Sequence, residues 1–221
     1  GSLFGVSGVD LRSAALRASK MVIDGVGGDG VAGSGGTGVR TYDWSDVPTE
    51  ITASDATITG VGGRVSASVD GYGGQGGRGV DMSRTRVNAN TVAIDGTGGV
   101  GTDDVGASKY ATGGDGVTTF RVNIAASATL SVVGRGAAAS ASGAGPLVPS
   151  PTTIGVDIQS STLVSDGLVT VRGEAPTGTG TWIGSPTEGS QTTLVRSTSP
   201  GGSVRLFGFG NDSAPANVGL R

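Results

Sequence analysis

The 221-residue sequence contains neither cysteine nor histidine, and each absence narrows the chemistry open to the chain. Without cysteine, disulfide bonds and thiolate metal sites are excluded, although the cellular compartment stays open. Without histidine, serine and cysteine triads, the usual zinc and non-haem iron sites and most general bases that act near neutral pH are excluded. We therefore expect a protein that uses no metal and no cofactor and that is not an enzyme.

Charge and long apolar stretches are also scarce. The formal net charge is -3, which is too small to indicate a nucleic acid or an acidic lipid surface as a partner. No stretch is long and apolar enough to cross a bilayer, and no signal peptide is visible. The sequence thus predicts no nucleic-acid partner and no membrane span.

Glycine, by contrast, is abundant, with 44 of the 221 residues. Such a content is typical of disordered or collagen-like chains. Here glycine does not recur at every third position, and the segments between glycine clusters are rich in valine, isoleucine and threonine, which favour β-strands. The composition therefore favours a folded all-β protein over disorder.

One motif recurs along the chain. Its clearest copy is GVDIQSSTLVSDGLVTVRG at residues 155–173, and further copies begin at Gly8, Gly38, Gly79 and Gly116. The copy that begins at Gly38 is lengthened by the insert YDWSDVPTE, and a degraded sixth copy begins near Gly189. Repeats of this length predict an architecture in which units stack, because no unit can bury its own apolar face.

The ninth position of each clear copy is aliphatic, and the residue two places later is small. Each copy then carries a short run of β-forming residues and closes on glycine, which indicates about three short strands per copy. Stacking predicts a right-handed parallel β-helix, or β-solenoid, of five to six coils, with the handedness taken from the general preference of such connections. The ninth positions would form one continuous core ladder of Leu16, Ile51, Val87, Ile124 and Leu163.

The copy boundaries predict a single β-helix domain over residues 8–210, with coils that begin near residues 8, 38, 79, 116, 155 and 189. We interpret residues 1–7 as a tag and lead-in and residues 211–221 as a tail or a truncated next coil, in an internal fragment of a longer protein. The glycine-rich stretches between copies, such as VGGDGVAGSGGTG, are interpreted as flexible loop excursions along one side of the rod. Phe207 and Phe209 would share one strand face, which indicates core packing or an interface with a next coil.

Two groups of residues are candidates for ligand binding. The insert brings Tyr42, Asp43, Trp44 and Asp46 together; aromatic faces stack on sugar rings, and carboxylates accept hydrogen bonds from sugar hydroxyls. Arg84 and Arg121 occupy the sixth position of successive copies, so they should lie nearly above one another, a spacing that suits sulfate or carboxylate. The alternatives are an inserted loop folded over the side of the rod, and arginines that only pair with aspartates nearby in the sequence.

Acidic residues recur at the third position of three copies, as Asp10, Asp81 and Asp157. A lyase or glycoside hydrolase built on a β-helix would need clustered carboxylates, or carboxylates with lysine or arginine, on one sheet face. Because these three acids are spread one per coil, we interpret them as a solvated or hydrogen-bonded ladder at a corner.

The coils GVDIQSSTLVSDGLVTVRGEAPTGTG and GVDMSRTRVNANTVAIDGTGGVG resemble those of filamentous haemagglutinin-type exoproteins, over roughly residues 8–180. The resemblance implies a secreted or surface protein of a Gram-negative bacterium, exported through an outer-membrane transporter partner by two-partner secretion. It further implies a role in adhesion or contact-dependent inhibition, with a glycan or protein receptor on host or bacterial cells as the partner. The long glycine-rich stretches and the insert depart from the family pattern, and they leave open whether this segment is shaft or receptor-binding region.

Two other functions stay open from the sequence. One is a carbohydrate-active β-helix enzyme or phage tailspike that acts on polysaccharide. The other is a passive scaffold shaft without a ligand of its own.

Overall fold

The computed structural model describes residues 4–31, 33–43, 46–66, 74–103, 112–141, 153–176, 178–184 and 192–210. Within these ranges every regular element is a strand. No helix that could span a membrane is therefore found among these residues. Trp44 of the insert, the start of the sixth copy at Gly189 and the tail 211–221 lie outside them.

The strands form two large parallel sheets and one small one. The first sheet takes one strand from each of the five clear copies, in the order β1 (Val9–Arg12), β3 (Val39–Tyr42), β5 (Val80–Ser83), β8 (Val117–Phe120) and β11 (Thr153–Gln159). A sixth strand, β14 (Gly178–Gly184), pairs with β11 and lies before the predicted start of the sixth copy at Gly189. The second sheet takes the strands that follow them: β2 (Ala15–Val26), β4 (Thr49–Val61), β6 (Thr85–Thr97), β9 (Asn123–Arg135), then β12 (Thr162–Ser165) with β13 (Leu168–Ala175), and β15 (Leu194–Ser197) with β16 (Ser203–Gly210). The small sheet pairs β7 (Gly101–Asp103) with β10 (Ala139–Ala141).

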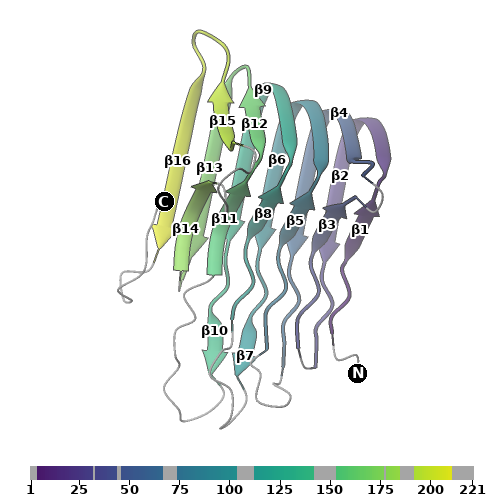
Figure 1. The fold of residues 1–221 in the computed structure, drawn as a ribbon, viewed down its shortest axis with the longest axis vertical. Helices are drawn as coiled ribbons and strands as arrows, with labels where there is room; N and C mark the ends of the chain where they lie inside the picture. Colours follow the sequence, from purple (N-terminus) through teal and green to yellow (C-terminus); the bar gives the residue numbers. More distant parts are fainter. Residues whose placement is uncertain are drawn as a thin grey trace.

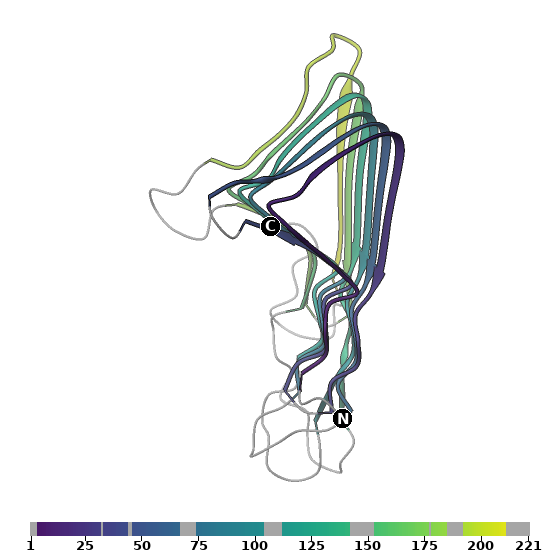
Figure 2. The same ribbon diagram turned by 90° about the vertical axis from the view of Figure 1, so that its right-hand side faces the viewer.

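Neighbouring strands in these sheets are parallel and come from successive repeats, so the chain winds as a β-solenoid of about 4 turns. Figure 1 shows the strands side by side along the stack. Viewed from its end, the stack has a triangular body above a narrow double layer (Figure 2). The first sheet forms one side of the triangle, and the second sheet bends near the middle of its long strands to form the other two. The all-β solenoid predicted from the repeats is thereby confirmed.

The core of the body is a set of aliphatic ladders. One ladder joins register partners in consecutive strands of the second sheet, and all but its first member are completely buried: Leu16, Ile51, Val87, Ile124 and Leu163. Another runs along the adjoining side through Ile23, Ile58, Ile94, Val132 and Val171. Burying one such side chain contributes about 1.5 to 3 kcal/mol, so these ladders hold the body together.

One corner of the triangle turns on a single residue with left-handed backbone geometry. Arg84 and Arg121 have φ angles of 45° and 55° at equivalent positions of successive repeats. The sharp turn leaves a carbonyl oxygen inside the body, and buried hydroxyls bind it: Thr85 Oγ1 donates to the Ser83 oxygen over 2.9 Å, and Ser161 Oγ donates to the Gln159 oxygen over 2.7 Å. These hydroxyls satisfy the buried carbonyl groups of the corner while the turn places the two arginines at the surface.

Below the body, the chain runs outward and back as two layers that meet through glycine (Figure 2). We call this region the glycine stem; it comprises outgoing segments 27–30, 62–65 and 98–102 and returning segments 34–38, 74–79 and 112–116. A Cβ added to Gly62 would overlap a carbonyl oxygen of the opposite layer, and one added to Gly99 would overlap a carbonyl oxygen of the neighbouring coil. Only glycine fits a spacing this small.

Backbone hydrogen bonds cross the stem in a continuous relay. The N–H groups of Gly36, Gly63, Gly77 and Gly99 each donate over 2.8 or 2.9 Å to the carbonyl oxygen of the preceding member, the first of them to Gly28. The other glycine of each pair bonds along its own layer, as Gly62 does to the Thr97 oxygen over 2.8 Å. In the stem, backbone amide groups therefore make many of the contacts between neighbouring coils that side chains make in the body.

Two interpretations of the sequence differ from this structure. The glycine-rich stretch after the first copy is not a flexible excursion where it is described, because Gly27, Gly28, Gly35 and Gly36 belong to the ordered stem. Phe207 and Phe209 do not pack in the core either: they lie on the outer face of β16 and are 41% and 50% exposed. The sequence shows neither that the glycine backbones pack closely against one another nor that the two phenylalanine side chains point away from the core.

Candidate functional site

A hollow lies at the corner formed by Arg84 and Arg121, which both have positive φ angles. Here the insert of the second repeat meets the two repeats that follow. Residues 43–48 connect β3 to β4, whereas Arg84 alone connects β5 to β6. Asp43 and Asp46 border this open hollow of about 470 Å³ at the neighbouring corner. Its lining includes Asp43, Asp46, Arg84, Arg86, Arg121 and Asn123.

Arg84 fastens the insert to this corner. Its Nη1 lies 2.5 Å from Asp43 Oδ2 and 2.7 Å from Asp46 Oδ1, so two carboxylates share one guanidinium group. The hydrogen bond with Asp43 and the attraction of that carboxylate raise the pKa of Arg84. Beside it, Arg86 Nη1 lies 3.5 Å from Glu50 Oε1. Both arginines are thus already matched by acids of the preceding repeat.

Arg121 stands at the same corner one coil further on. Ser83 and Phe120 are register partners, and the Arg84 amide donates to the Phe120 carbonyl oxygen over 2.9 Å, so the two corner arginines follow adjacent strands. The guanidinium carbon of Arg121 lies 4.9 Å from the centre of the Phe120 ring. Within the described ranges, Arg121 forms no ion pair with a carboxylate.

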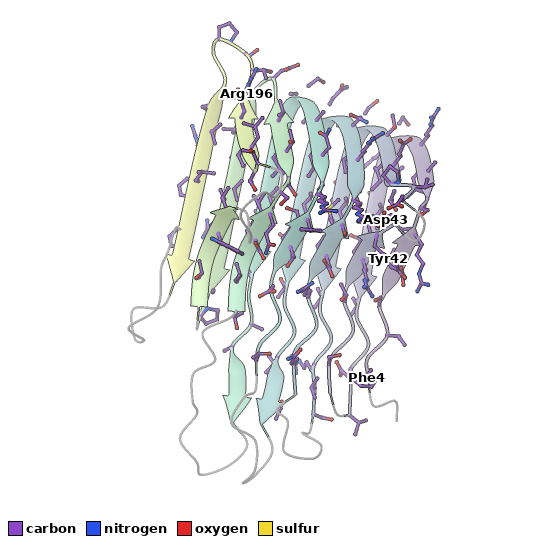
Figure 3. The ribbon with its side chains drawn as sticks, viewed as in Figure 1. Phe4, Tyr42, Asp43 and Arg196 are labelled. Carbon is purple, nitrogen blue, oxygen red and sulfur yellow. The ribbon has the colours of Figure 1, made fainter. Side chains whose placement is uncertain are left out.

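Tyr42 lies on the outer face of the first sheet, beside Asp43 (Figure 3). Its ring is flanked by the guanidinium groups of Arg12 and Arg40, at 5.0 and 4.5 Å from its centre. Trp44 lies outside the described residues. Of the residues proposed from the sequence, the two aspartates and the two arginines therefore meet in one hollow, and the tyrosine lies next to it.

No family model, curated protein or solved structure matches the chain. The resemblance to filamentous haemagglutinin-type exoproteins accordingly rests on the coil sequences alone. The corner has to be interpreted from its own chemistry: a guanidinium group without an acidic partner binds carboxylate or sulfate through parallel N–H donors. Neighbouring carboxylates can accept hydrogen bonds from hydroxyl groups of the same ligand.

A second polar cluster lies on the outer face of the first sheet, near the junction of body and stem. Arg78 Nη1 lies 3.0 Å from Asp81 Oδ2, and Arg78 Nε lies 3.5 Å from Asp115 Oδ2. The other oxygen of Asp115 accepts a hydrogen bond of 2.8 Å from the Ile154 amide. Thr118 is the register partner of both Asp81 and Asp157 in the neighbouring strands. The three side chains therefore lie in one row across β5, β8 and β11.

Asp157 is the most buried acid of this cluster, with only 5% of its surface exposed. Gln159 Nε2 donates to its Oδ2 over 2.5 Å, whereas neither Asp157 Oδ1 nor Thr118 Oγ1 has a hydrogen-bond partner among the described residues. Burial, opposed by the bond from Gln159, raises the pKa of Asp157 to about 7. The third-position acids are hydrogen-bonded but differ in burial: Asp10 pairs with exposed Arg12 at 2.8 Å, whereas Asp157 is enclosed and holds its proton into the neutral range.

This cluster was not expected from the sequence, because two of its members lie outside the motif. Arg78 and Asp115 each stand directly before the leading glycine of a copy, and that shared position was the only available signal. Among the described residues, no three acidic side chains are arranged to hold a metal ion. The cluster consequently offers hydrogen bonding and proton binding as its chemistry.

Proposed function

We propose that this chain is a stiff segment of a secreted or surface bacterial exoprotein of the filamentous haemagglutinin type, and that it attaches to anionic glycans through the corner hollow. In this proposal the solenoid is a right-handed β-helix of five to six coils, and export uses an outer-membrane transporter partner. Support comes from the stacked parallel coils, which hold surface groups at fixed spacing, and from the coil sequences that resemble that family.

The contrast between the two corner arginines carries the proposal. Arg84 is neutralised by Asp43 and Asp46, whereas Arg121 has no acidic partner within the described ranges. A carboxylate or sulfate can accept two parallel N–H bonds from such a guanidinium group, which are stronger than bonds between neutral groups. Asn123, in the same lining, can form hydrogen bonds with the hydroxyl groups of a sugar ring. An acidic or sulfated sugar residue can therefore bind Arg121 through its anionic group and Asn123 through its hydroxyls.

The test is binding of the purified chain to uronate-containing and sulfated polysaccharides at low and high salt. We expect saturable binding that weakens as salt is added, because the contact is between exposed charges. Arg121→Ala should lose about tenfold in affinity or more, equivalent to one charge-assisted hydrogen-bonded pair. The matched control is Arg196→Ala, since Arg196 is an exposed arginine on β15, far from Asp43 in the stack (Figure 3).

Equal binding by Arg121→Ala and the parent would contradict the proposed site. A parent chain that binds none of these polysaccharides would contradict the attachment function itself and favour a passive shaft. The double change Tyr42→Ala with Trp44→Ala then asks whether the insert contributes an aromatic contact of its own.

Cleavage of polysaccharide is the second candidate function, and the Asp157 cluster is the observation that favours it. Asp81 and Asp157 are two strands apart on one sheet face, a spacing of about 9.6 Å between strands. This is near the upper limit for an acid and a base that act from opposite sides of a glycosidic bond. A carboxyl group with a pKa of about 7, as in Asp157, can still donate a proton at neutral pH, and Asp81, which pairs with Arg78, is the candidate to accept one from water.

A reducing-end assay on the same polysaccharides decides this second candidate. Product release by the parent and its loss in Asp157→Asn would establish it, against our expectation from the sequence. An inactive parent chain would leave Asp157 as a structural group.

A further inference from the structure

Two phenylalanine rings stand on the outer face of the last strand. Phe207 and Phe209 of β16 alternate with Val204 and Leu206, which continue the inward ladders of Val169 and Val171 of the strand beneath. All four are partly exposed, but for different reasons. A further coil stacked on the end would cover the inward pair, whereas coils stack along the axis and do not cover the outer face. A further coil would flank the two rings along the stack but leave their outward sides exposed.

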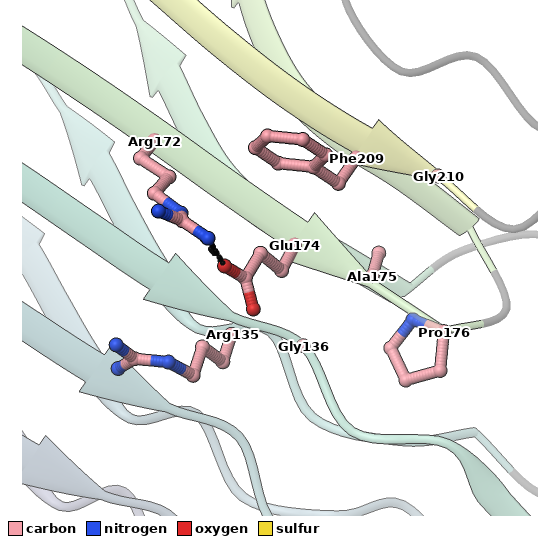
Figure 4. Close-up of a pocket in the computed structure, with 8 residues that line it drawn as sticks. All are labelled: Arg135, Gly136, Arg172, Glu174, Ala175, Pro176, Phe209 and Gly210. Atoms are coloured by element: carbon pink, nitrogen blue, oxygen red, sulfur yellow. Dashed lines mark hydrogen bonds and ion pairs between the residues drawn. The ribbon is translucent and has the colours of Figure 1, made fainter.

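Phe209 borders a hollow of about 650 Å³ on this face (Figure 4). The guanidinium carbon of Arg172 lies 5.1 Å from the centre of the ring, and its Nε and Nη2 lie 2.7 and 2.6 Å from Glu174 Oε1. Arg135, one coil back, also lines the hollow and donates through Nη1 to Asp95 Oδ1 over 2.7 Å. An aromatic ring thus lies beside a row of hydrogen-bonding groups.

The charges around this hollow are balanced. Arg172 pairs with Glu174, and Arg135 pairs with Asp95, so an ionic ligand would have to displace an existing partner. Each pair nevertheless keeps spare capacity: among the described residues, Glu174 Oε2 accepts no hydrogen bond, and Arg135 donates through Nη1 alone. An uncharged hydroxyl can donate to Glu174 and accept from Arg135 without breaking either pair.

We propose that this hollow is a second binding site, which takes an uncharged pyranose residue of a polysaccharide. The apolar face of the sugar lies on Phe209, and its hydroxyls bind Glu174 and Arg135. The site differs from the corner in position and in ligand class. Within the part of the chain that the structure describes, Arg121 at the corner has no acidic partner, whereas both arginines of this hollow have one. The proposal is therefore independent of the proposed attachment to anionic glycans, and either can fail without the other.

The test is binding of the whole chain to soluble, uncharged glucan, galactan, mannan and xylan, measured by affinity electrophoresis at low and high salt. We expect saturable binding to at least one of them, unchanged by salt. Phe209→Ala should weaken it about tenfold, as should Phe209→Leu, which keeps apolar volume but lacks a flat ring. Phe4→Ala, at another exposed phenylalanine, and Arg121→Ala should bind like the parent.

Thermal melting of each variant is the control for folding, and we expect each melting temperature to lie close to that of the parent. A parent chain that binds none of the four polysaccharides would overturn the proposal, and so would Phe209→Ala or Phe209→Leu binding as tightly as the parent. A loss in Arg121→Ala equal to that in Phe209→Ala would also overturn it, because the corner would then be part of the same site.

Discussion

In the triangular body, aliphatic side chains stack between the hydrogen-bonded strands of successive coils, whereas in the glycine stem backbone hydrogen bonds between glycines make most of the contacts. Ile58 and Ile94 are register partners, completely or almost completely buried, that fill the body as rungs of one ladder. Gly63 and Gly99 belong to the same two coils, yet their only contribution is an N–H group, a carbonyl group and the absence of a side chain. One repeat unit therefore stacks by two different physical means along its length.

The difference lies in what the neighbouring atoms can do. A core side chain is surrounded by other side chains, which can shift slightly, so apolar replacements of similar volume are tolerated and charges are not. A stem glycine is surrounded by carbonyl oxygens and carbonyl carbons of the next coil or the opposite layer. Because these atoms belong to the hydrogen-bonded relay, even one methyl group must disrupt it.

Ile124→Asp should have the largest effect on the body. Ile124 is completely buried in the first ladder, and an unpaired carboxylate there costs several kcal/mol, against a total stability of about 5 to 15 kcal/mol for a typical domain. We expect the variant to be unfolded by circular dichroism at room temperature. Ala125→Asp, at the next and exposed position of β9, is the control and should melt close to the parent. If Ile124→Asp melted like the parent, the register of the ladder would be wrong.

Gly99→Ala should have the largest effect that a single added methyl group can have. The new Cβ would overlap the Gly63 carbonyl group, and the relay through both residues would have to open, at a cost of about 3 kcal/mol or more. Urea unfolding measures this loss. Gly201→Ala is the matched control, because a Cβ at Gly201 meets no atom within 4 Å. Equal stability of the two variants would mean that the stem layers are not closely packed.

The pH dependence of stability tests the junction between the two regions. Burial raises the pKa of Asp157 to about 7, whereas an aspartate in an unfolded chain titrates near 4. The folded protein thus binds this proton more tightly, so the stabilisation is complete below about pH 4 and is lost as the pH rises through 7. The loss should amount to about 2 to 4 kcal/mol between pH 4 and pH 8.

Asp157→Asn should therefore flatten the decline in urea stability across that pH range. Part of the decline should remain, because burial also raises the pKa of Asp115, which lies in the same cluster with Arg78 and Asp81. Asp24→Asn, at an exposed position of β2, is the control. An unchanged slope in Asp157→Asn would show that this carboxyl group is not the titrating one.

The body could be predicted from the sequence because its repeats carry side chains in phase. Once the copies are aligned, Ile51, Val87 and Ile124 fall at one position, and the same alignment places Arg84 and Arg121 at one corner. The contact of Arg84 with the insert could not be derived, since it depends on how far residues 43–48 reach toward the next coil.

The stem could not be predicted in the same way, because glycine carries no hydrophobic pattern. Its only signal was the recurrence of two Gly-Gly pairs between copies, such as Gly62-Gly63 and Gly76-Gly77, which composition alone does not distinguish from a flexible linker. The burial of Asp157 was hidden for a related reason: the motif fixes its position in the coil but not what covers it.

Hydrogen exchange of the backbone amides of Gly63, Gly77 and Gly99, followed by NMR on the intact chain, tests the ordered stem most directly. The relay of hydrogen bonds predicts protection comparable to that of Ile94 in the body. Exchange of these glycines at the rate of an unstructured peptide, while Ile94 stays protected, would contradict the backbone-packed stem and restore the flexible loops that the composition suggests.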